Sequence, residues 1–288
     1  MKKEFTKPAL ALGMACALLL TGCSAAANEA GGTSSEKNAS ASPAVKELSA
    51  IEKVREANPD NIDPTLIYKS IGENSNGKYV VLGANPNSKF AKFDPKLWNQ
   101  TGDNWTEAEM AKMQVAAIDF LAATMLSGPG VGGNDADRSK QADETLKKMD
   151  KASLADGGEK VVRDVFKGPD ANNPFLIVTD PKESKSMGYQ VFQEATSSRY
   201  LDAKVIVNHA ESYDKGYKGP LGTATADIAS VDVAALVKKK LVKDGETYAQ
   251  PVYINYDISF VKDGKDVSIT GVNIMGTDFS DAPTKAEF

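Results

Sequence analysis

Residues 252–260 read VYINYDISF and form the clearest strand pattern in the chain. Large apolar side chains alternate here with polar ones and a tyrosine, and neighbouring side chains of a strand point to opposite faces of a sheet. This period of two predicts one buried side and one solvent-facing side. The sequence KDGK at 262–265 predicts a hairpin turn, and residues 267–275 predict the returning strand with a bulge at Gly271.

Helical patterns precede these strands. The strongest covers residues 106–127, where Thr106 and Glu109 have the spacing of a capping box and Gly128-Pro129 ends the helix. Its later part, VAAIDFLAATML, is apolar on nearly every side, which predicts a helix buried in the domain. Further helices are predicted at residues 48–57, 64–71, 139–150 and 158–167.

The remaining segments are read as strands or stay open. Residues 78–82 and 175–179 are compact strand candidates, whereas residues 189–199 and 203–213 alternate and would pair with each other. Residues 232–242 fit a helix or a strand. The run Ala-Ala-Leu and the following lysines favour a helix there.

Helices first and antiparallel strands last are typical of an α+β domain. We therefore predict an α+β fold in which N-terminal helices pack on a C-terminal antiparallel sheet that can curve. One domain is expected over residues 45–276, followed by a polar tail at 277–288. The order of elements over roughly residues 100–288 resembles that of NTF2-like (cone-shaped) domains, which implies a sheet wrapped around a long helix.

The N-terminus carries a separate pattern. Residues 1–8 are polar and basic, and residues 9–20, ALALGMACALLL, form an apolar run that is too short to span a bilayer as a helix. The run ends in Leu20-Thr21-Gly22-Cys23. These four residues resemble the lipobox of bacterial lipoproteins, which consists of a large aliphatic residue, a small residue, Gly or Ala, and Cys.

The lipobox resemblance implies that residues 1–22 are a signal peptide and that Cys23 is the lipid attachment site and first residue of the mature protein. Residues 23–44 are rich in Ala, Ser and Gly and are expected to form a flexible tether. The protein is therefore expected at the extracytoplasmic face of the cell membrane, where two acyl chains hold a protein stably.

Composition excludes several classes of function. The formal net charge is -5, and the densest basic run is the short segment 238–240, which argues against a nucleic-acid partner. The two cysteines are Cys16 and Cys23, and Cys16 lies in the segment expected to be removed. The mature chain can form no internal disulfide and no cysteine-rich zinc site.

The sequence holds no complete catalytic set. His209 is the only histidine, which excludes the two-histidine zinc-protease motif, and no serine lies in a G-x-S-x-G elbow. His209 is in step with Val205 and Val207 and is interpreted as structural. Ser75 and Lys78 fit S-x-x-K, but they lie in a turn before a strand rather than at the start of a helix.

Two other motifs have structural explanations. The glycine-rich loop at 128–133 follows a helix instead of a strand, so it is interpreted as a flexible connection and not as a phosphate-binding loop. The acidic residues between 135 and 144 lack the glycine and glutamate positions of a calcium-binding EF-hand loop. No metal or cofactor is expected.

The candidate ligand-binding residues are Tyr253, Asn255 and Asp257, on the polar face of the 252–260 strand with Ser259. If the sheet curves, this face would line a pocket in which Asp257 serves as a base and Tyr253 as a hydrogen-bond donor. If the sheet is flat, the same side chains face water. Both arrangements stay open at this stage.

We therefore predict a non-enzymatic, membrane-tethered module that binds a protein or another envelope component. The alternative is a small-ligand carrier or an enzyme with a pocket on the face of residues 253–259. A solute-binding lipoprotein would need two lobes of repeated strand–helix units, and the sequence lacks that alternation.

Overall fold

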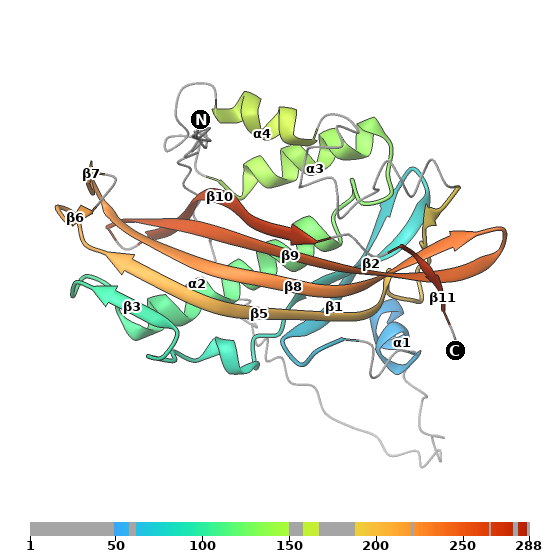
Figure 1. The fold of residues 1–288 in the computed structure, drawn as a ribbon, viewed down its shortest axis with the longest axis horizontal. Helices are drawn as coiled ribbons and strands as arrows, with labels where there is room; N and C mark the ends of the chain where they lie inside the picture. Colours follow the sequence, from blue (N-terminus) through green and yellow to red (C-terminus); the bar gives the residue numbers. More distant parts are fainter. Residues whose placement is uncertain are drawn as a thin grey trace, which may run out of the picture.

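A computed structural model describes residues 49–57, 62–149, 158–166, 188–219, 222–264, 266–278 and 282–286. The N-terminal segment with Cys23 and the strand predicted at 175–179 lie outside these ranges. The described part is an α+β fold with helices mainly in its N-terminal half and long strands in its C-terminal half (Figure 1). The predicted fold class is thus confirmed.

The helices and strands follow one another along the chain as α1 (Ala50–Ala57), β1 (Leu66–Asn74), β2 (Gly77–Ala84), the 3-10 turn η1 (Lys89–Ala91), β3 (Trp98–Thr101), α2 (Glu107–Asp119), the π-helical turn η2 (Phe120–Leu126), α3 (Asp135–Lys147), α4 (Gly158–Phe166), β4 (Gln190–Val191), β5 (Tyr200–Tyr213), β6 (Lys218–Gly219), β7 (Gly222–Thr223), β8 (Asp227–Lys243), β9 (Glu246–Asp263), β10 (Asp266–Asp278) and β11 (Thr284–Lys285).

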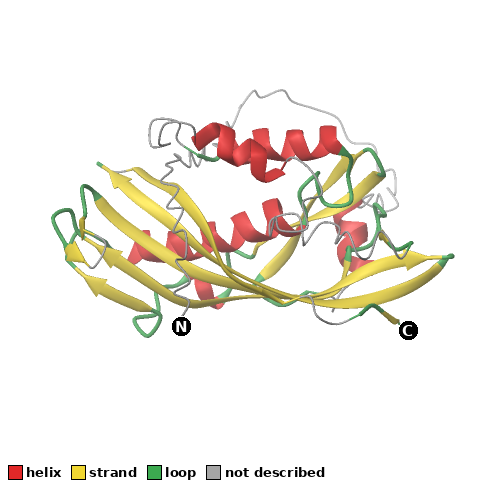
Figure 2. Cartoon of the chain, turned by 45° about the horizontal axis from the view of Figure 1, so that its top comes forward, coloured by secondary structure: helices red, strands yellow, loops and turns green. Residues whose placement is uncertain are grey.

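One large sheet organises the molecule. Its strand order is β10-β9-β8-β5-β3, with β4 paired to β8 and β11 paired to β9. The neighbours among β5, β8, β9 and β10 are antiparallel, whereas β3 runs parallel to β5. Figure 2 shows the helices gathered on one side of this curved sheet. The long strands and the helical layer therefore form two layers with the core between them.

The predicted C-terminal hairpin is confirmed. In β9 the side chains of Val252, Ile254, Tyr256, Ile258 and Phe260 are all buried, and the residues between them are partly exposed. The register between β9 and β10 shifts between Ile269 and Gly271, as a bulge at this position requires, and again between Ile274 and Gly276. Alternation thus predicted both the strand and its buried face.

The predicted buried helix is also confirmed. Thr106 and Glu109 form the capping box at the start of α2, and α2 lies against β5 and β8. Its continuation η2 widens into a π-helical turn that ends at Ser127, whose hydroxyl donates to the carbonyl oxygen of Ala122 at 2.6 Å. None of the described helices combines the length and hydrophobicity that a membrane crossing needs.

One predicted helix is wrong, and one segment left open between helix and strand, with a helix favoured, is a strand. Residues 232–242 belong to the strand β8, because pairing with β5 on one side and β9 on the other outweighs the helical propensity of Ala, Leu and Lys. Residues 64–71 lead into β1 instead of a helix. Asp63 does not cap a helix there: its Oδ1 accepts from the Thr65 amide at 2.9 Å in a tight turn before the strand.

Three connecting segments also differ from prediction. The segment 189–199 contributes only the short strand β4, which pairs with β8 and not with β5. The segment 277–288, predicted as a polar tail, contains the end of β10 and the strand β11. The loop 128–133 is packed, since Gln141 accepts from the Gly130 amide at 2.7 Å and residues 128–131 are buried; this differs from the predicted flexible connection.

Candidate functional site

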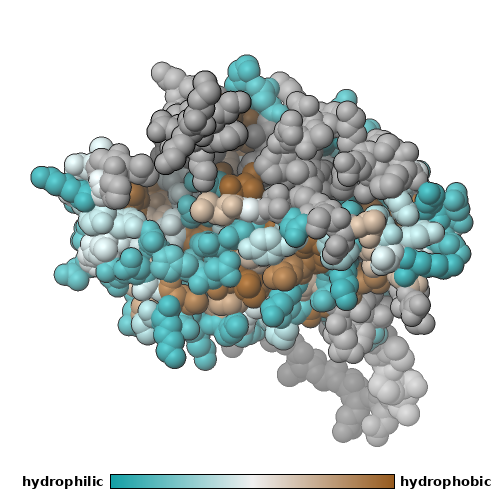
Figure 3. All heavy atoms as spheres, viewed as in Figure 1, coloured by the Kyte–Doolittle hydropathy of each residue, from teal (hydrophilic) through white to brown (hydrophobic). Residues whose placement is uncertain are grey.

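One face of the large sheet is not covered by any described helix. The inward side chains of β5, β8, β9 and β10 belong to the core, and we call the opposite surface of these four strands the open face. Figure 3 views this face and shows hydrophobic side chains gathered in its middle among hydrophilic ones. Leu236 of β8, on this face, is 44% exposed. The open face is therefore an apolar surface with a polar surround.

A row of polar side chains crosses the open face. The strand registers place His209 opposite Asp232, Asp232 opposite Asp257, and Asp257 opposite Asn273. Directly paired side chains on one face of an antiparallel sheet have Cβ atoms about 4.5–5.5 Å apart. We call these four residues the carboxylate row, because two aspartates on adjacent strands form its centre.

His209 joins this row because of a bulge in β5. The register between β5 and β8 shifts between Val207 and His209, so the alternation that buries Val205 and Val207 is interrupted. The His209 side chain is consequently 49% exposed, with its Nε2 at 3.0 Å from Oε1 of Glu211. The prediction that His209 lies in step with the two valines is wrong, since an extra residue at a bulge reverses the alternation.

The carboxylate of Asp232 is held by neutral donors. Its Oδ1 accepts from the Asn208 amide nitrogen at 3.1 Å, and its Oδ2 accepts from the Asn255 amide nitrogen at 3.3 Å. Within the described ranges, no lysine or arginine forms an ion pair with Asp232. Asn255, one of the three predicted ligand-binding residues, thus positions a carboxylate that the sequence analysis did not single out.

Asp257 carries a perturbed carboxyl group. Burial raises its pKa above the ordinary value, and the charges of Asp232 and Glu211 raise it further, against hydrogen bonds to Ser230 and Asn273. Oδ1 of Asp257 and Oδ1 of Asn255 are buried acceptors for which the described part of the chain supplies no donor. The row therefore has more acceptor oxygens than donors.

Glu211 extends the polar network toward one end of β5. The Tyr213 hydroxyl donates to Glu211, which lowers the pKa of that carboxyl, and the charge of Glu211 helps to raise the pKa of Tyr213 to about 12. The Tyr213 ring also packs on the ring of Tyr217, with centroids 4.6 Å apart. The side chains on this part of the open face are thus ordered by one another.

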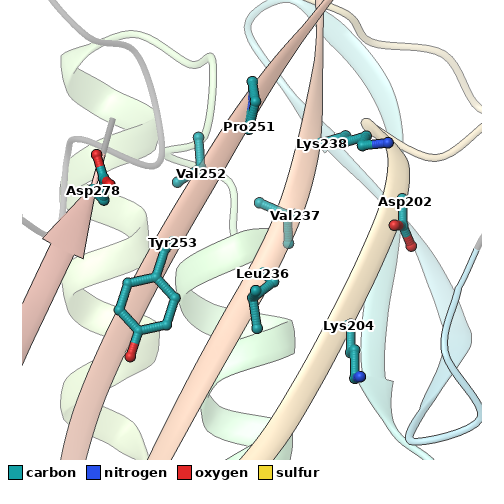
Figure 4. A pocket seen from close by; sticks show the side chains of 9 residues that line it. All are labelled: Asp202, Lys204, Leu236, Val237, Lys238, Pro251, Val252, Tyr253 and Asp278. Carbon is teal, nitrogen blue, oxygen red and sulfur yellow. The ribbon is translucent and has the colours of Figure 1, made fainter. Parts of the chain in front are cut away.

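A shallow hollow of about 350 Å³ lies on the open face beside the row. Figure 4 shows Leu236 and Tyr253 on adjacent strands at this hollow, with Lys204 on the next strand. The full lining consists of Asp202, Lys204, Leu236, Val237, Lys238, Pro251, Val252, Tyr253 and Asp278. The predicted site is therefore divided: Tyr253 lines the hollow, Asp257 belongs to the row, and Asn255 donates to Asp232 of the row.

These features define a class by architecture alone: a two-layer α+β domain whose sheet has one face free of described helices. Among the described residues, no group of three or more His, Cys, Asp or Glu side chains is placed to hold a metal ion. Comparisons with protein-family models, curated proteins and solved structures find no match.

We expect Asp257→Asn to stabilise the protein at neutral pH. Because the pKa of Asp257 is raised in the folded protein, the folded state binds a proton more tightly than the unfolded chain does. The free energy of unfolding therefore falls as the pH rises from the ordinary pKa of an aspartate through the raised pKa of Asp257. Asparagine keeps the shape of the side chain but carries no charge. The expected gain is roughly 0.2–1 kcal/mol, the size of a like-charge pair across two strands.

Urea unfolding over a series of pH values measures this effect. The gain in the free energy of unfolding should be present at pH values above the raised pKa of Asp257. It should disappear at pH values below the ordinary pKa of an aspartate. Asp202→Asn is the matched control, because Asp202 is exposed on the same face and lies opposite Lys238. An equal gain in both variants, or a gain that does not change with pH, would contradict the explanation.

Proposed function

We propose that this protein is a lipid-anchored binding module that is held at the extracytoplasmic face of the membrane through Cys23 and binds a protein or another envelope component with its open face. Binding requires no catalysis and no cofactor. The observation that carries the proposal is the apolar middle of the open face, where Leu236 is 44% exposed beside the hollow.

An antiparallel sheet with one solvated face normally carries polar side chains on that face. Exposed apolar side chains that gather in one patch with a polar rim are typical of interaction sites. On the open face, Leu236 lies at the hollow next to Tyr253, and the carboxylate row borders this region along β8 and β9. The arrangement therefore supports binding of a partner that supplies complementary apolar surface.

A small-ligand carrier is the second candidate, and the hollow lined by Tyr253 favours it. An enzyme that uses Asp257 as a base would need that carboxyl to reach a ligand in the hollow. Asp257 is not among the lining residues, and the register places it opposite Asp232 while Tyr253 lies opposite Leu236. The open face as a whole is thus better suited to a larger partner.

Site-specific photo-crosslinking in living cells tests the proposal. A photoreactive phenylalanine analogue in place of Leu236 should give discrete crosslinked products of higher mass. The same analogue in place of Lys112, which is exposed on α2 in the helical layer, is the matched control and should give few or none. Equal crosslinking at both positions, or none at Leu236, would contradict a binding role for the open face.

A further inference from the structure

The carboxylates of the open face are unevenly distributed. Near the hollow, Lys204 and Lys238 are accompanied by Asp202 and Asp278. At the other end of the face lie Glu211 and the two aspartates of the carboxylate row, and the register places no lysine or arginine opposite any of these three on β5, β8, β9 or β10. The apolar hollow is thus nearly balanced in charge, whereas the row is acidic.

Among the described residues, neutral donors hold the carboxylates of Asp232 in the row and of the neighbouring Glu211. Asp232 accepts from two amide groups, and Glu211 accepts from a tyrosine hydroxyl.

Carboxylates elsewhere in the protein do have cationic partners. Lys69 lies 2.8 Å from Asp119, and Lys262 lies 2.7 Å from Glu109. Within the described ranges, no lysine or arginine forms an ion pair with the carboxylates of the row. A bound ammonium or guanidinium group would supply both the charge and the donors that Oδ1 of Asp257 lacks in the described residues.

Distances along β8 relate the row to the hollow. Asp232 and Leu236 lie on the same face of β8 and are separated by four residues, which corresponds to about 13 Å in a strand. An extended polypeptide has the same rise per residue as a strand. A basic side chain and an apolar side chain four residues apart in such a segment would therefore reach the carboxylate row and the hollow at the same time. A free amine or a compact ligand is too short to do so.

From this geometry, and resting on the proposed function, we propose that the open face binds an extended polypeptide segment in which a lysine or arginine contacts the carboxylate row and a large apolar side chain, four residues along, fills the hollow. The partner is thus a basic, partly apolar segment of another protein. Charge complementarity supplies selectivity and a faster association rate, and the apolar side chain supplies the buried contact.

Fluorescence anisotropy with three labelled peptides tests the partner class. The probe KSKSLSLS places lysine and leucine four residues apart on one side of an extended chain. ESESLSLS reverses the charge, and KSKSSSSS removes the apolar side chains. The full-length protein purified from membranes, in nanodiscs of zwitterionic lipid, is titrated against each peptide, and empty nanodiscs correct for partition into lipid.

The lysine–leucine probe should bind at least about tenfold more tightly than either of the other two peptides. Its affinity should fall between about 0.1 M and 1 M salt, where the screening length drops from about 10 Å to about 3 Å. The double variant Asp232→Asn/Asp257→Asn should weaken binding about tenfold, and Leu236→Ser should do the same. Urea unfolding of each variant shows whether it is folded under the conditions of the titration, and a loss of affinity in a folded variant is not explained by unfolding.

The control variant Glu56→Gln/Glu107→Gln removes the same charge from exposed positions on α1 and α2 and should change the affinity less than twofold. An equal loss in this control, or equal binding of the three peptides, would overturn the proposed partner. Absence of peptide binding together with strong crosslinking at Leu236 in cells would overturn the partner class alone. Absence of both would overturn the binding function itself.

Discussion

Cys23→Ala is expected to abolish lipid attachment and cleavage of the signal peptide completely. Cells fed a labelled fatty acid should incorporate it into the unchanged protein and not into the variant, and the intact mass of the variant should correspond to an unprocessed precursor. The physical reason is that only the sulfur of cysteine can form the thioether to a diacylglyceryl group. Alanine offers no atom for this bond.

The expected effect on location follows from the energetics of the anchor. Each buried CH2 group contributes about 0.8 kcal/mol to membrane binding, and two acyl chains make that binding stable. The chain contains its own matched control, since Cys16→Ala changes the other cysteine within the segment expected to be removed. A Cys23→Ala protein that is processed and lipid-labelled like the unchanged protein would contradict the proposed anchor and location together.

Arg199→Ala should destabilise the fold by about 3–5 kcal/mol. Arg199 is 1% exposed, and its guanidinium lies 3.8 Å from the centre of the Tyr79 ring. Its Nη1 donates to the Gly128 carbonyl at 3.2 Å, and its Nη2 donates to Oε1 of Gln193 at 2.9 Å. The arginine therefore joins β2, the packed loop after η2 and the segment after β4.

Truncation at Arg199 would remove the arginine donors of Oε1 of Gln193 and of the Gly128 carbonyl, which keeps only the Val131 amide, and would leave a cavity beside Tyr79. Burial lowers the pKa of Arg199 to about 10, so the group stays charged at neutral pH and its hydrogen bonds keep their charge-assisted strength. Urea or thermal unfolding measures the loss. Arg163→Ala is the control, because that arginine is 42% exposed on α4, and it should cost no more than about 0.5 kcal/mol.

Local sequence patterns were sufficient to predict a helix or strand where one face of that element is uniformly buried. The β9 strand alternates between apolar and polar side chains along most of its length, and the capping box of α2 satisfies its first amides within the same short segment. In both cases the residues that determine the element are neighbours in the chain. The α+β class followed from the order of these elements alone.

The sequence favoured a helix over a strand for residues 232–242 because the determinants of β8 are distant in sequence. Residues 232–242 contain good helix formers, and the strand forms because two long partners, β5 and β9, pair with both of its edges. The inward alternation of Val231, Val233, Ala235 and Val237 is visible in the sequence, but Ala234 and the lysine run obscure it. Tertiary pairing outweighs a propensity difference of less than about 1 kcal/mol per residue.

The candidate site shows the same division. The polar side of β9, with Tyr253, Asn255 and Asp257, was predictable from alternation within a single strand. The sequence could not predict that Asp232 and His209 belong to the carboxylate row. Their positions depend on the register between strands and on the bulge that turns His209 outward. The hollow likewise takes its walls from β5, β8, β9 and β10.

The amino-acid order alone thus determines the buried helix and the alternation of the last two strands, and it predicts the export and lipidation pattern at the N-terminus. All three are encoded by residues close together in the chain, through composition, capping and periodicity. Tertiary structure decides which side chains share the open face, how close the two aspartates lie and where the apolar hollow forms. Those relations arise from pairing between strands that are distant in the sequence. A shift of the pairing register by one residue would move every side chain of a strand to the opposite face of the sheet.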